Sequence, residues 1–383
     1  MSPIRVGFVG LSSTGWASIS LAPPLLSSPL SSHYTITALS TSSPQSAQLA
    51  AEKYTALSPR SPQVQVKPYH GSTSSIASDT DVDLVVVSVK TPDHKMALAP
   101  AIEKGKDVFV EWPLGNGLEE AKELAGMARA KGVRTMVGMQ GWQIPEVKKV
   151  KEVIQAGRIG RVLSSTFVSA HFRWSLPYLF RYHLRDHQWF RSAASPQRYL
   201  TGHRLLITFI QALGPLTSLS ATSTQLLPTI QFIDSSHAAT GEPILSHLPD
   251  QYSLSGILKD SGALFTATWR GGISSAGEKN GNNSRPTMIW TIDGDEGWIR
   301  MESTGSGGSF MHVYGIQKVW LNGELIDVEK DGLNNSGRAF MEFAKGDEVG
   351  VYPTFDDALV VHKHVEAVKI SSAEGRKVDI SSL

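Results

Sequence analysis

The sequence predicts an α/β protein of two domains: a doubly wound domain over residues 1–142 and an α/β domain with a large, mostly antiparallel open sheet over residues 143–383. In the first part, short apolar segments alternate with helical patterns, which is typical of a parallel sheet covered by helices. In the second part, β-rich segments are separated by Gly, Asn and Asp turns, which favours antiparallel pairing. A chain of 383 residues is long enough for two such domains.

Five apolar segments of the first domain predict its strands. The first is short and is followed by glycine, and the third is a continuous valine-rich segment of the kind found in buried parallel strands. The segment between the last two strands is rich in Ala, Glu, Leu and Lys, which favour a helix. The predicted strands are Ile4–Val9, Tyr34–Leu39, Leu84–Val89, Val108–Val110 and Thr135–Val137, and the helix is Leu118–Lys131.

The second domain is predicted to begin with a helix whose apolar face carries Val147, Val150, Val153 and Ile154, and which Gly157 is suited to end. Two more helices are expected near residues 203–213 and 355–370. Segments of alternating or β-rich composition predict the sheet. They are residues 161–172, 252–259, 263–269, 287–292, 298–302 and 310–320.

Composition excludes several classes of function. The formal net charge is +1 and basic residues form no long run, so charge does not indicate a nucleic-acid-binding face. The absence of cysteine excludes disulfides, thiolate zinc sites and cysteine nucleophiles. The N-terminus lacks a signal-peptide layout, and no apolar run reaches the ~18 residues of a membrane span. We therefore expect a cytoplasmic protein, also nuclear if it is a regulator, with neither nucleic acid nor membrane as partner.

A degenerate glycine motif follows the first predicted strand. Residues 10–15 read Gly-Leu-Ser-Ser-Thr-Gly, so that Ser12 stands at the second glycine of a Gly-x-Gly-x-x-Gly pattern. Such a loop lets a dinucleotide pyrophosphate approach the backbone beside a helix N-terminus. The strand–loop–helix context favours this function over an ordinary turn. The expected cofactor-binding residues of the loop are Gly10, Ser12, Ser13, Thr14 and Gly15.

The loop after the second strand bears on the choice of cofactor. NAD sites commonly place an acidic residue there for the ribose hydroxyls. Residues 40–43 read Ser-Thr-Ser-Ser, with no carboxylate to repel a 2′-phosphate and no arginine to bind one. We expect Thr41 and Ser42 to contact the cofactor, with NAD or NADP undecided and a slight preference for tolerance of NADP. The alternative is a polar loop without this role.

Four ordered motifs now point to a known family. They are Val6–Gly10, Lys90–His94, Glu103–Pro113 and Ile154–Gly160. Together they resemble the glucose–fructose oxidoreductase/inositol dehydrogenase family (Gfo/Idh/MocA). Within it, the dipeptides Gly15-Trp16, Glu111-Trp112 and Gln140-Gly141 resemble the branch of the fungal galactose-regulon repressor.

The resemblance implies a Rossmann domain, a nicotinamide cofactor, a usually sugar-like substrate and a homodimer or higher oligomer formed through the C-terminal sheet. It places Glu111 by the nicotinamide ribose and His94 near the nicotinamide pocket. Further cofactor contacts are expected from Thr91, Pro92, Trp112 and Gln140.

The resemblance also exposes two replacements. The catalytic lysine of the family corresponds to Trp112, whose side chain cannot carry a proton to or from a hydroxyl. The family aspartate that stands four residues before a histidine corresponds to Tyr199, if the histidine is His203. The usual proton-transfer residues are therefore absent.

Three residues are candidates for the missing acid/base role, which hydride transfer from an alcohol requires. Tyr199 and His203 would share one helix face, although Leu206 and Phe209 continue that face and favour a histidine at the edge of the core instead. Lys90 ends the valine-rich strand, where ligands of open α/β sheets bind. The alternative for Lys90 is a solvated residue or a cofactor contact.

An aromatic and basic segment, together with two tryptophans, predicts the substrate pocket. In the resembled family this region lines the pocket, and arginine with aromatic residues would suit a bulky, flat or acidic metabolite. His183 and His187 have helical metal-ligand spacing, but no carboxylate completes a pattern and no metal is expected. The alternative is an aromatic loop at a subunit interface. The predicted substrate-binding residues are Trp112, Trp142, His171, Arg173, Trp174, His183 and His187.

Three functions fit these observations. The first is an NAD(P)-dependent oxidoreductase with a non-standard acid/base set, acting on a bulky or aromatic/acidic metabolite. The second is a non-catalytic, dinucleotide-binding transcriptional co-regulator that acts through a protein partner. The third is a non-redox enzyme in a reused pocket.

Overall fold

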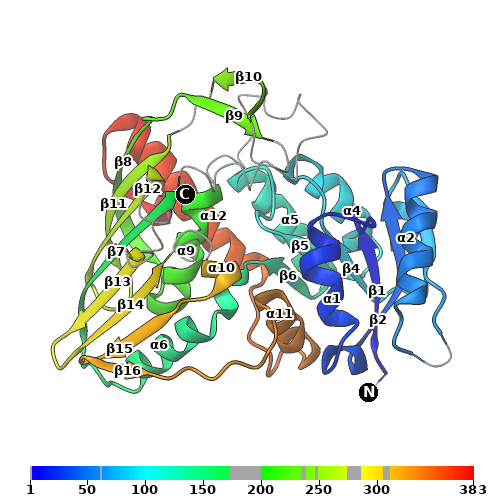
Figure 1. Ribbon diagram of the computed structural model, residues 1–383, viewed down its shortest axis with the longest axis horizontal. Helices are drawn as coiled ribbons and strands as arrows, with labels where there is room; N and C mark the ends of the chain where they lie inside the picture. Colours follow the sequence, from blue (N-terminus) through cyan, green and yellow to red (C-terminus); the bar gives the residue numbers. More distant parts are fainter. Residues whose placement is uncertain are drawn as a thin grey trace. The chain divides into compact units, whose positions relative to one another are not determined.

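The computed structural model describes residues 2–60, 63–172, 200–233, 239–245, 249–273, 286–304 and 311–383. The chain divides into two compact units (Figure 1). The first comprises Met1–Gln143 and Asp331–His362, and the second comprises Ile144–Lys330 and Lys363–Leu383. The single boundary predicted after residue 142 therefore lacks the return of Asp331–His362 to the first unit.

The first unit contains, in its described residues, a six-stranded parallel sheet in the order β3-β2-β1-β4-β5-β6. The five predicted strands are present. The sixth, β3, was not predicted because it is short and mostly exposed, so that it lacks an apolar signal. The strands are β1 (Ile4–Val9), β2 (Tyr34–Thr41), β3 (Lys67–His70), β4 (Leu84–Val87), β5 (Asp107–Glu111) and β6 (Thr135–Gly138).

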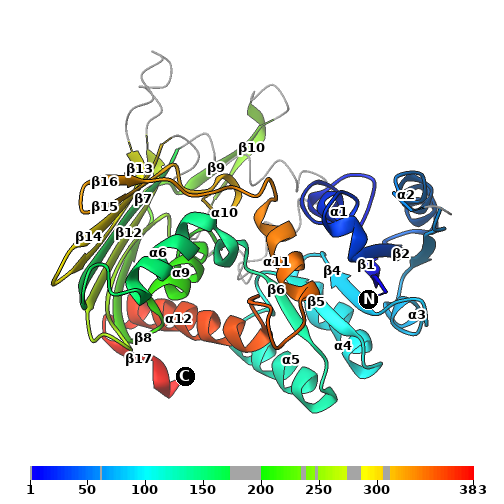
Figure 2. The same cartoon turned by 90° about the horizontal axis from the view of Figure 1, so that it is seen from below.

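Helices cover both faces of this sheet, with α1, α2 and α11 on one face and α3, α4 and α5 on the other (Figure 2). Local sequence sets several ends: the Ser43 hydroxyl accepts from the Ser46 N–H to cap α2, and Gly132, at φ 64°, ends α5. The helices are α1 (Ala22–Leu25), α2 (Pro44–Ala56), α3 (Ser74–Ala77), α4 (His94–Glu103), α5 (Leu118–Lys131) and α11 (Asn335–Ala344).

The returning segment completes the core of the first unit. Phe340 of α11 stacks on Phe109 of β5, with ring centroids 5.2 Å apart, and meets the Tyr34 ring edge-on at 5.6 Å. The Tyr34 hydroxyl donates to the Phe340 carbonyl at 2.6 Å. Burying these large rings removes much apolar surface from water, which explains why α11 packs here.

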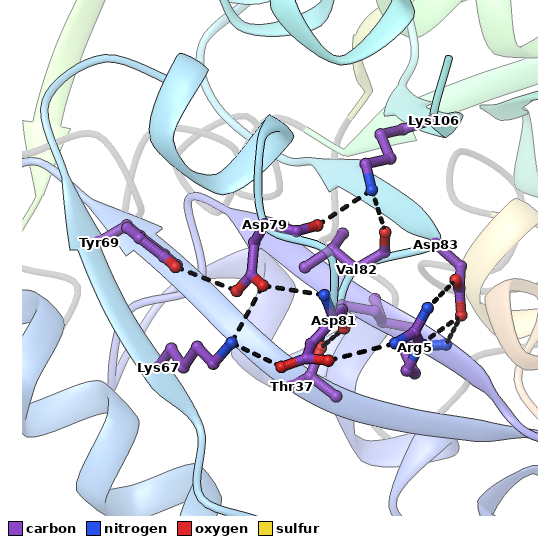
Figure 3. A network of polar contacts seen from close by, with 10 residues as sticks. Arg5, Thr37, Lys67, Tyr69, Asp79, Asp81, Val82, Asp83 and Lys106 are labelled. Atoms are coloured by element: carbon purple, nitrogen blue, oxygen red, sulfur yellow. Dashed lines mark hydrogen bonds and ion pairs between the residues drawn. The ribbon is translucent and has the colours of Figure 1, made fainter. Parts of the chain in front are cut away.

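The amino end of the sheet carries a connected group of charges (Figure 3). Arg5 at the start of β1 donates to the Asp83 carboxylate at 2.6 and 3.0 Å. Lys67 at the start of β3 donates to Asp79 at 3.0 Å and to Asp81 at 2.7 Å. The hydrogen bond from Arg5 holds the pKa of Asp83 below its ordinary value. Burial alone would raise the pKa of Asp79, but hydrogen bonds from the Asp81 N–H and from Lys67 lower it.

The second unit contains, among its described residues, a nine-stranded sheet in the order β16-β15-β14-β13-β7-β12-β11-β8-β17. The β7–β12 pair is parallel and the other pairs are antiparallel. The strands are β7 (Val162–Phe172), β8 (Leu216–Thr224), β11 (Gln251–Leu258), β12 (Leu264–Ile273), β13 (Pro286–Gly294), β14 (Trp298–Thr304), β15 (Lys318–Leu321), β16 (Glu324–Ile326) and β17 (Val378–Asp379), and β9 (Thr229–Ile233) pairs separately with β10 (Ala239–Leu245).

Helix α6 (Pro145–Gln155) and helix α9 (Leu200–Leu213) pack together in this unit, and α12 (Phe355–Glu374) continues into it from the first. The apolar face predicted for α9 is buried, and its Phe209 ring lies 4.1 Å from the Phe265 ring. The predicted strand over residues 310–320 is correct only at its end, where β15 begins at Lys318. Met311–Tyr314 form the helical turn α10, and Gly315 at φ 74° separates it from β15, because this backbone conformation interrupts an extended segment.

Side chains alternate between the two faces of the large sheet. Phe167, Phe265 and Trp290 are buried on one face, whereas Thr166 on the other face is exposed. The predicted oligomer through this sheet stays a prediction. In the described part of the chain, no helix is long and apolar enough to cross a membrane.

Candidate functional site

The carboxyl end of the six-stranded sheet brings together the glycine loop and the residues that follow β4, β5 and β6. Gly10, at φ 96°, directly follows β1 and lies very close to the backbone that follows β4. An added Cβ would lie 2.2 Å from the Ser88 carbonyl oxygen. Only glycine fits this turn. A Cβ on Gly15, at φ 111°, would meet nothing nearer than the Ser12 hydroxyl at 3.7 Å, so the loop backbone is open here.

The side chains of the loop leave this backbone accessible. Ser13 and Thr14 are exposed, and the Ser12 hydroxyl donates to the Thr14 carbonyl and so folds onto the loop itself. Lys53 of α2 donates to the Ser13 carbonyl at 2.8 Å. The loop therefore presents main-chain groups beside one cation, which suits a phosphate-bearing ligand.

The Glu111 carboxylate is held between two neighbouring segments. The Trp16 indole N–H donates to Oε1 at 2.8 Å, and the Gln140 amide donates to Oε1 at 3.3 Å and to Oε2 at 3.1 Å. A Cβ on Gly138 would lie 2.7 Å from Oε2, so glycine at the end of β6 makes room for the carboxylate. The fixed carboxylate links the glycine loop, β5 and β6 at one edge of the sheet.

His94 has a different environment from the one expected of a cofactor contact. It is 1% exposed, and its Nδ1 lies 2.8 Å from the Pro113 carbonyl oxygen while its Nε2 lies 3.2 Å from that of Val89. Burial lowers the pKa of His94, with the nearby backbone carbonyls opposing the shift. A neutral ring donates only one N–H, so this histidine can hydrogen-bond one of the two carbonyls and thereby joins the segments after β4 and β5. Its role as a cofactor contact stays a prediction.

The other predicted residues at this end of the sheet lie in two segments, one at the end of β2 and one after β4. Thr41 ends β2 and donates to the Ser43 carbonyl at 3.2 Å, and Ser42 is exposed beside it. Lys90 is half-buried and precedes a short 3-10 turn over Thr91–Asp93, in which Thr91 is buried and Pro92 is exposed. Ser43 of the polar run serves as the N-cap of α2.

Trp112 packs against a histidine from the far end of the chain. It is 7% exposed, and its ring centroid lies 4.8 Å from that of His362 on α12, with an angle of 44° between the planes. Among the described residues, neither Trp112 Nε1 nor His362 Nε2 has a hydrogen-bond partner. Burial lowers the pKa of His362 to about 4. His362 is not predictable as a site residue from the sequence, because a histidine within a C-terminal helix belongs to no motif.

On the segment that follows β6, two further polar atoms lack partners among the residues that the structure describes. Trp142 is half-buried and its Nε1 is unpaired. Gln143 is fully buried; its amide nitrogen donates to the Val351 carbonyl at 2.8 Å, but its Oε1 accepts nothing. Sequence analysis predicted Trp142 as a substrate contact and did not select Gln143.

The remaining predicted residues lie outside this edge. Of His171 in β7 and His203 on α9, only the backbone is described. Five fall outside the described residues, namely Arg173, Trp174, His183, His187 and Tyr199. Their proposed roles stay predictions. Trp16 was noted in the sequence only as part of a dipeptide motif, and its bond to Glu111 was not foreseen.

Comparisons with known proteins agree with this geometry. A family described as an oxidoreductase family with an NAD-binding Rossmann fold matches residues 4–139, and the Gal80p C-terminal domain family matches residues 145–303. Dehydrogenase aclE of Aspergillus oryzae is 31% identical over 387 residues, which cover 97% of each chain. The galactose/lactose metabolism regulatory protein GAL80 of Saccharomyces cerevisiae is 25% identical over 79% of this chain and 67% of its own length.

Solved structures show the same fold. A super-repressor mutant of Gal80p from Saccharomyces cerevisiae matches with a TM-score of 0.81 at 21% identity, over 99% of this chain and 98% of that chain. An oxidoreductase from Thermotoga maritima matches with a TM-score of 0.70 at 19% identity, over 99% of each chain. With aclE aligned along almost the whole sequence, the chain belongs to the Gfo/Idh/MocA oxidoreductase family and carries a Gal80p-type C-terminal domain.

Proposed function

We propose that this protein is an NAD(P)-dependent oxidoreductase with a non-standard acid/base set, acting on a bulky, aromatic or acidic metabolite. One observation carries the proposal: the glycine loop leaves β1 where the strand order reverses between β1 and β4. In open α/β sheets, dinucleotides bind outside the carboxyl ends of the strands at this switch point.

The residues of this edge fit a dinucleotide. Gly15 leaves the loop backbone open, and exposed Ser13 and Thr14 flank it. Thr41 at the end of β2 and Ser42 directly after it would meet the adenosine ribose, and the absence of a carboxylate there is compatible with either NAD or NADP. When bound, the nicotinamide supplies hydride acceptance or donation.

The fixed Glu111 carboxylate has a positioning role in this proposal. Its two donors, Trp16 and Gln140, keep it at the end of β5 in one orientation, so it can accept from a ribose hydroxyl without rearranging. His94 holds the backbone of Pro113 in place. The proton-transfer candidates inferred from the sequence are Lys90, Tyr199 and His203.

The test is a pair of measurements on the purified full-length chain. Fluorescence titration with NADH and NADPH should show saturable binding, and a panel of secondary alcohols that includes aromatic and carboxylated members should reduce NAD⁺ or NADP⁺. Binding of neither nucleotide would reject the proposal. Binding without turnover of any alcohol, or of the matching ketones in reverse, would favour the regulator described next.

A second candidate function is a non-catalytic dinucleotide-binding regulator. It is favoured by the Gal80p-type domain over residues 145–303 together with tryptophan at the family lysine position. A regulator needs nucleotide-dependent capture of a protein partner and no turnover. Affinity capture from an extract of the native host, with and without NAD or NADP, separates it from an enzyme: a partner retained only with nucleotide, by a protein without turnover, would support the regulator.

A further inference from the structure

Among the described residues of the first unit, seven buried side-chain polar atoms lack hydrogen-bond partners. Three of them, on Thr35, Tyr54 and Arg60, are scattered over other elements, whereas the other four lie together: three on segments that follow β5 or β6, and one on His362 beside Trp112. Buried polar groups in folded proteins are hydrogen-bonded in the great majority, because an unpaired one costs free energy. Unpaired groups gathered at the ligand-binding edge of a sheet therefore indicate a partner that arrives from outside the chain. The atoms are Trp112 Nε1, Trp142 Nε1, Gln143 Oε1 and His362 Nε2.

Two of these groups are complementary and adjacent. Trp112 can only donate through its indole N–H, whereas a neutral histidine nitrogen can accept. The two rings are in contact, with centroids 4.8 Å apart. A hydroxyl group needs both functions at once, since its oxygen accepts and its proton is donated.

We propose, on the basis of the oxidoreductase function proposed above, that Trp112 and His362 bind the hydroxyl group of a secondary-alcohol substrate and that His362 Nε2 accepts its proton. Trp112 occupies the position of the family lysine, and the histidine beside it takes over the proton. The indole N–H keeps the oxygen in place.

The hydroxyl O–H bond breaks, and its proton goes to His362 Nε2. The electron pair of that bond forms the carbonyl π bond, while the substrate C–H bond breaks and its hydride passes to NAD(P)⁺. The products are a ketone, NAD(P)H and an imidazolium that returns its proton to water. Burial keeps the free imidazole neutral at pH 7, the form that accepts a proton.

A second histidine of the same helix provides a matched comparison. His364 is fully buried, but its Nε2 accepts a hydrogen bond from the Leu216 N–H at 2.9 Å. It has the features of a structural histidine. His362 is equally removed from solvent, at 4% exposed, but its Nε2 has no partner. The difference separates a group that stabilises the fold from one available to a ligand.

The experiment compares His362→Leu with His364→Leu in the full-length chain, using melting temperature, NADH and NADPH binding, and turnover of the most active secondary alcohol of the panel. His362→Leu should melt at or above the wild-type temperature, bind nucleotide normally and lose about 100-fold or more in kcat, as expected for loss of a general base. His364→Leu should melt below the wild type. Trp112→Phe, which keeps a ring but removes the N–H, should mainly raise KM.

Two results would overturn the assignment: full turnover by His362→Leu, or a fall in its melting temperature as large as that of His364→Leu. His203→Ala is a further variant that separates the two assignments. A larger loss of kcat in His203→Ala than in His362→Leu would assign the proton-accepting role to Tyr199 and His203 instead of His362. Failure of the wild type to bind nucleotide would instead reject the underlying oxidoreductase function, and the melting comparison would still show whether His362 is structural.

Discussion

The two ends of the six-stranded sheet treat polar side chains differently. At the amino end, Arg5, Lys67 and their aspartates form a connected group in which the carboxylates are paired within the chain (Figure 3). At the carboxyl end, Trp112 and His362 are buried with nitrogen atoms that have no partner. The difference teaches that the charged groups of the amino end have their partners within the chain, whereas two buried nitrogen atoms of the carboxyl end have none among the described residues.

The carboxyl end also contains polar groups that are fully engaged. Glu111 accepts from Trp16 and Gln140, and both ring nitrogens of His94 face backbone carbonyls. These residues fix the loops around the site. The comparison is therefore between individual groups with and without partners, and burial alone does not separate them.

Gly10→Ala should produce the largest effect on stability. The new Cβ would lie 2.2 Å from the Ser88 carbonyl oxygen at a φ of 96°, so strain and overlap together should cost about 4 kcal/mol of unfolding free energy. Gly132→Ala is the control, because its φ is also positive, at 64°, but no atom lies within 4 Å; about 1 kcal/mol is expected there. Urea denaturation measures both, and equal losses would contradict the close approach at Gly10.

Stability should fall as pH is lowered from 6.5 towards 4. Burial lowers the pKa of His362 to about 4, against 6.5 in the unfolded chain. Above pH 6.5 the histidine is neutral in both states and costs no stability; as the pH falls towards 4, only the unfolded chain takes up the proton, and the free energy of unfolding drops by about 3 kcal/mol. His94, whose pKa is also lowered, acts in the same direction. Below pH 4, protonation of Asp79 and Asp83 removes further stability, since their pKa values are lowered in the fold. His362→Leu should flatten only the upper window of a urea–pH series; an unchanged profile would refute the buried neutral state.

Asp107→Ala should cost about 2 kcal/mol, because it leaves the half-buried Arg134 without its carboxylate partner. Arg134 donates to Asp107 at 2.8 Å and lies 4.2 Å from the centre of the Phe343 ring. Asp81→Ala is the matched control at the same end of the sheet: Asp81 is 54% exposed, and less than about 1 kcal/mol is expected. If Asp81→Ala lowered the free energy of unfolding as much as Asp107→Ala, solvent exposure would not determine how much each ion pair stabilises the fold.

Trp16→Phe should have the smallest effect on stability but should weaken nucleotide binding by about tenfold, which corresponds to one lost hydrogen bond to a charged group. Glu111 would then be held by Gln140 without the indole donor. Trp298→Phe, at an exposed position of the second unit, is the control for loss of an indole. Unchanged affinities of Trp16→Phe for NADH and NADPH would contradict the proposed positioning role of Glu111.

Elements set by local pattern could be predicted from the sequence. The helix Leu118–Lys131 has the predicted ends, because its composition and Gly132 determine them. The five apolar strands and the glycine turn at Gly10 were likewise visible. Residues 310–320 were misread because alternation alone does not reveal the turn that Gly315 makes.

Contacts between distant segments could not be predicted in this way. Trp16 and Glu111 are 95 positions apart, and their bond depends on the parallel order of strands that brings both to one edge. Packing α11 into the first unit depends on the shape complementarity of Phe340 with Phe109 and Tyr34, which sequence spacing does not encode. His362 was missed for the same reason, since its significance comes only from the ring it contacts.

The buried indole N–H of Trp112 has no hydrogen-bond partner in the part of the chain that the structure describes. Nuclear magnetic resonance of protein labelled with ¹⁵N at its nine tryptophan indoles tests it directly. Trp290 is the internal standard, being fully buried with its N–H donating to the Ser165 hydroxyl at 2.9 Å. After assignment with Trp112→Phe and Trp290→Phe, the account predicts a downfield, hydrogen-bonded indole proton for Trp290 and an upfield, unbonded one for Trp112. A Trp112 proton as far downfield as that of Trp290, in protein free of ligand, would contradict it.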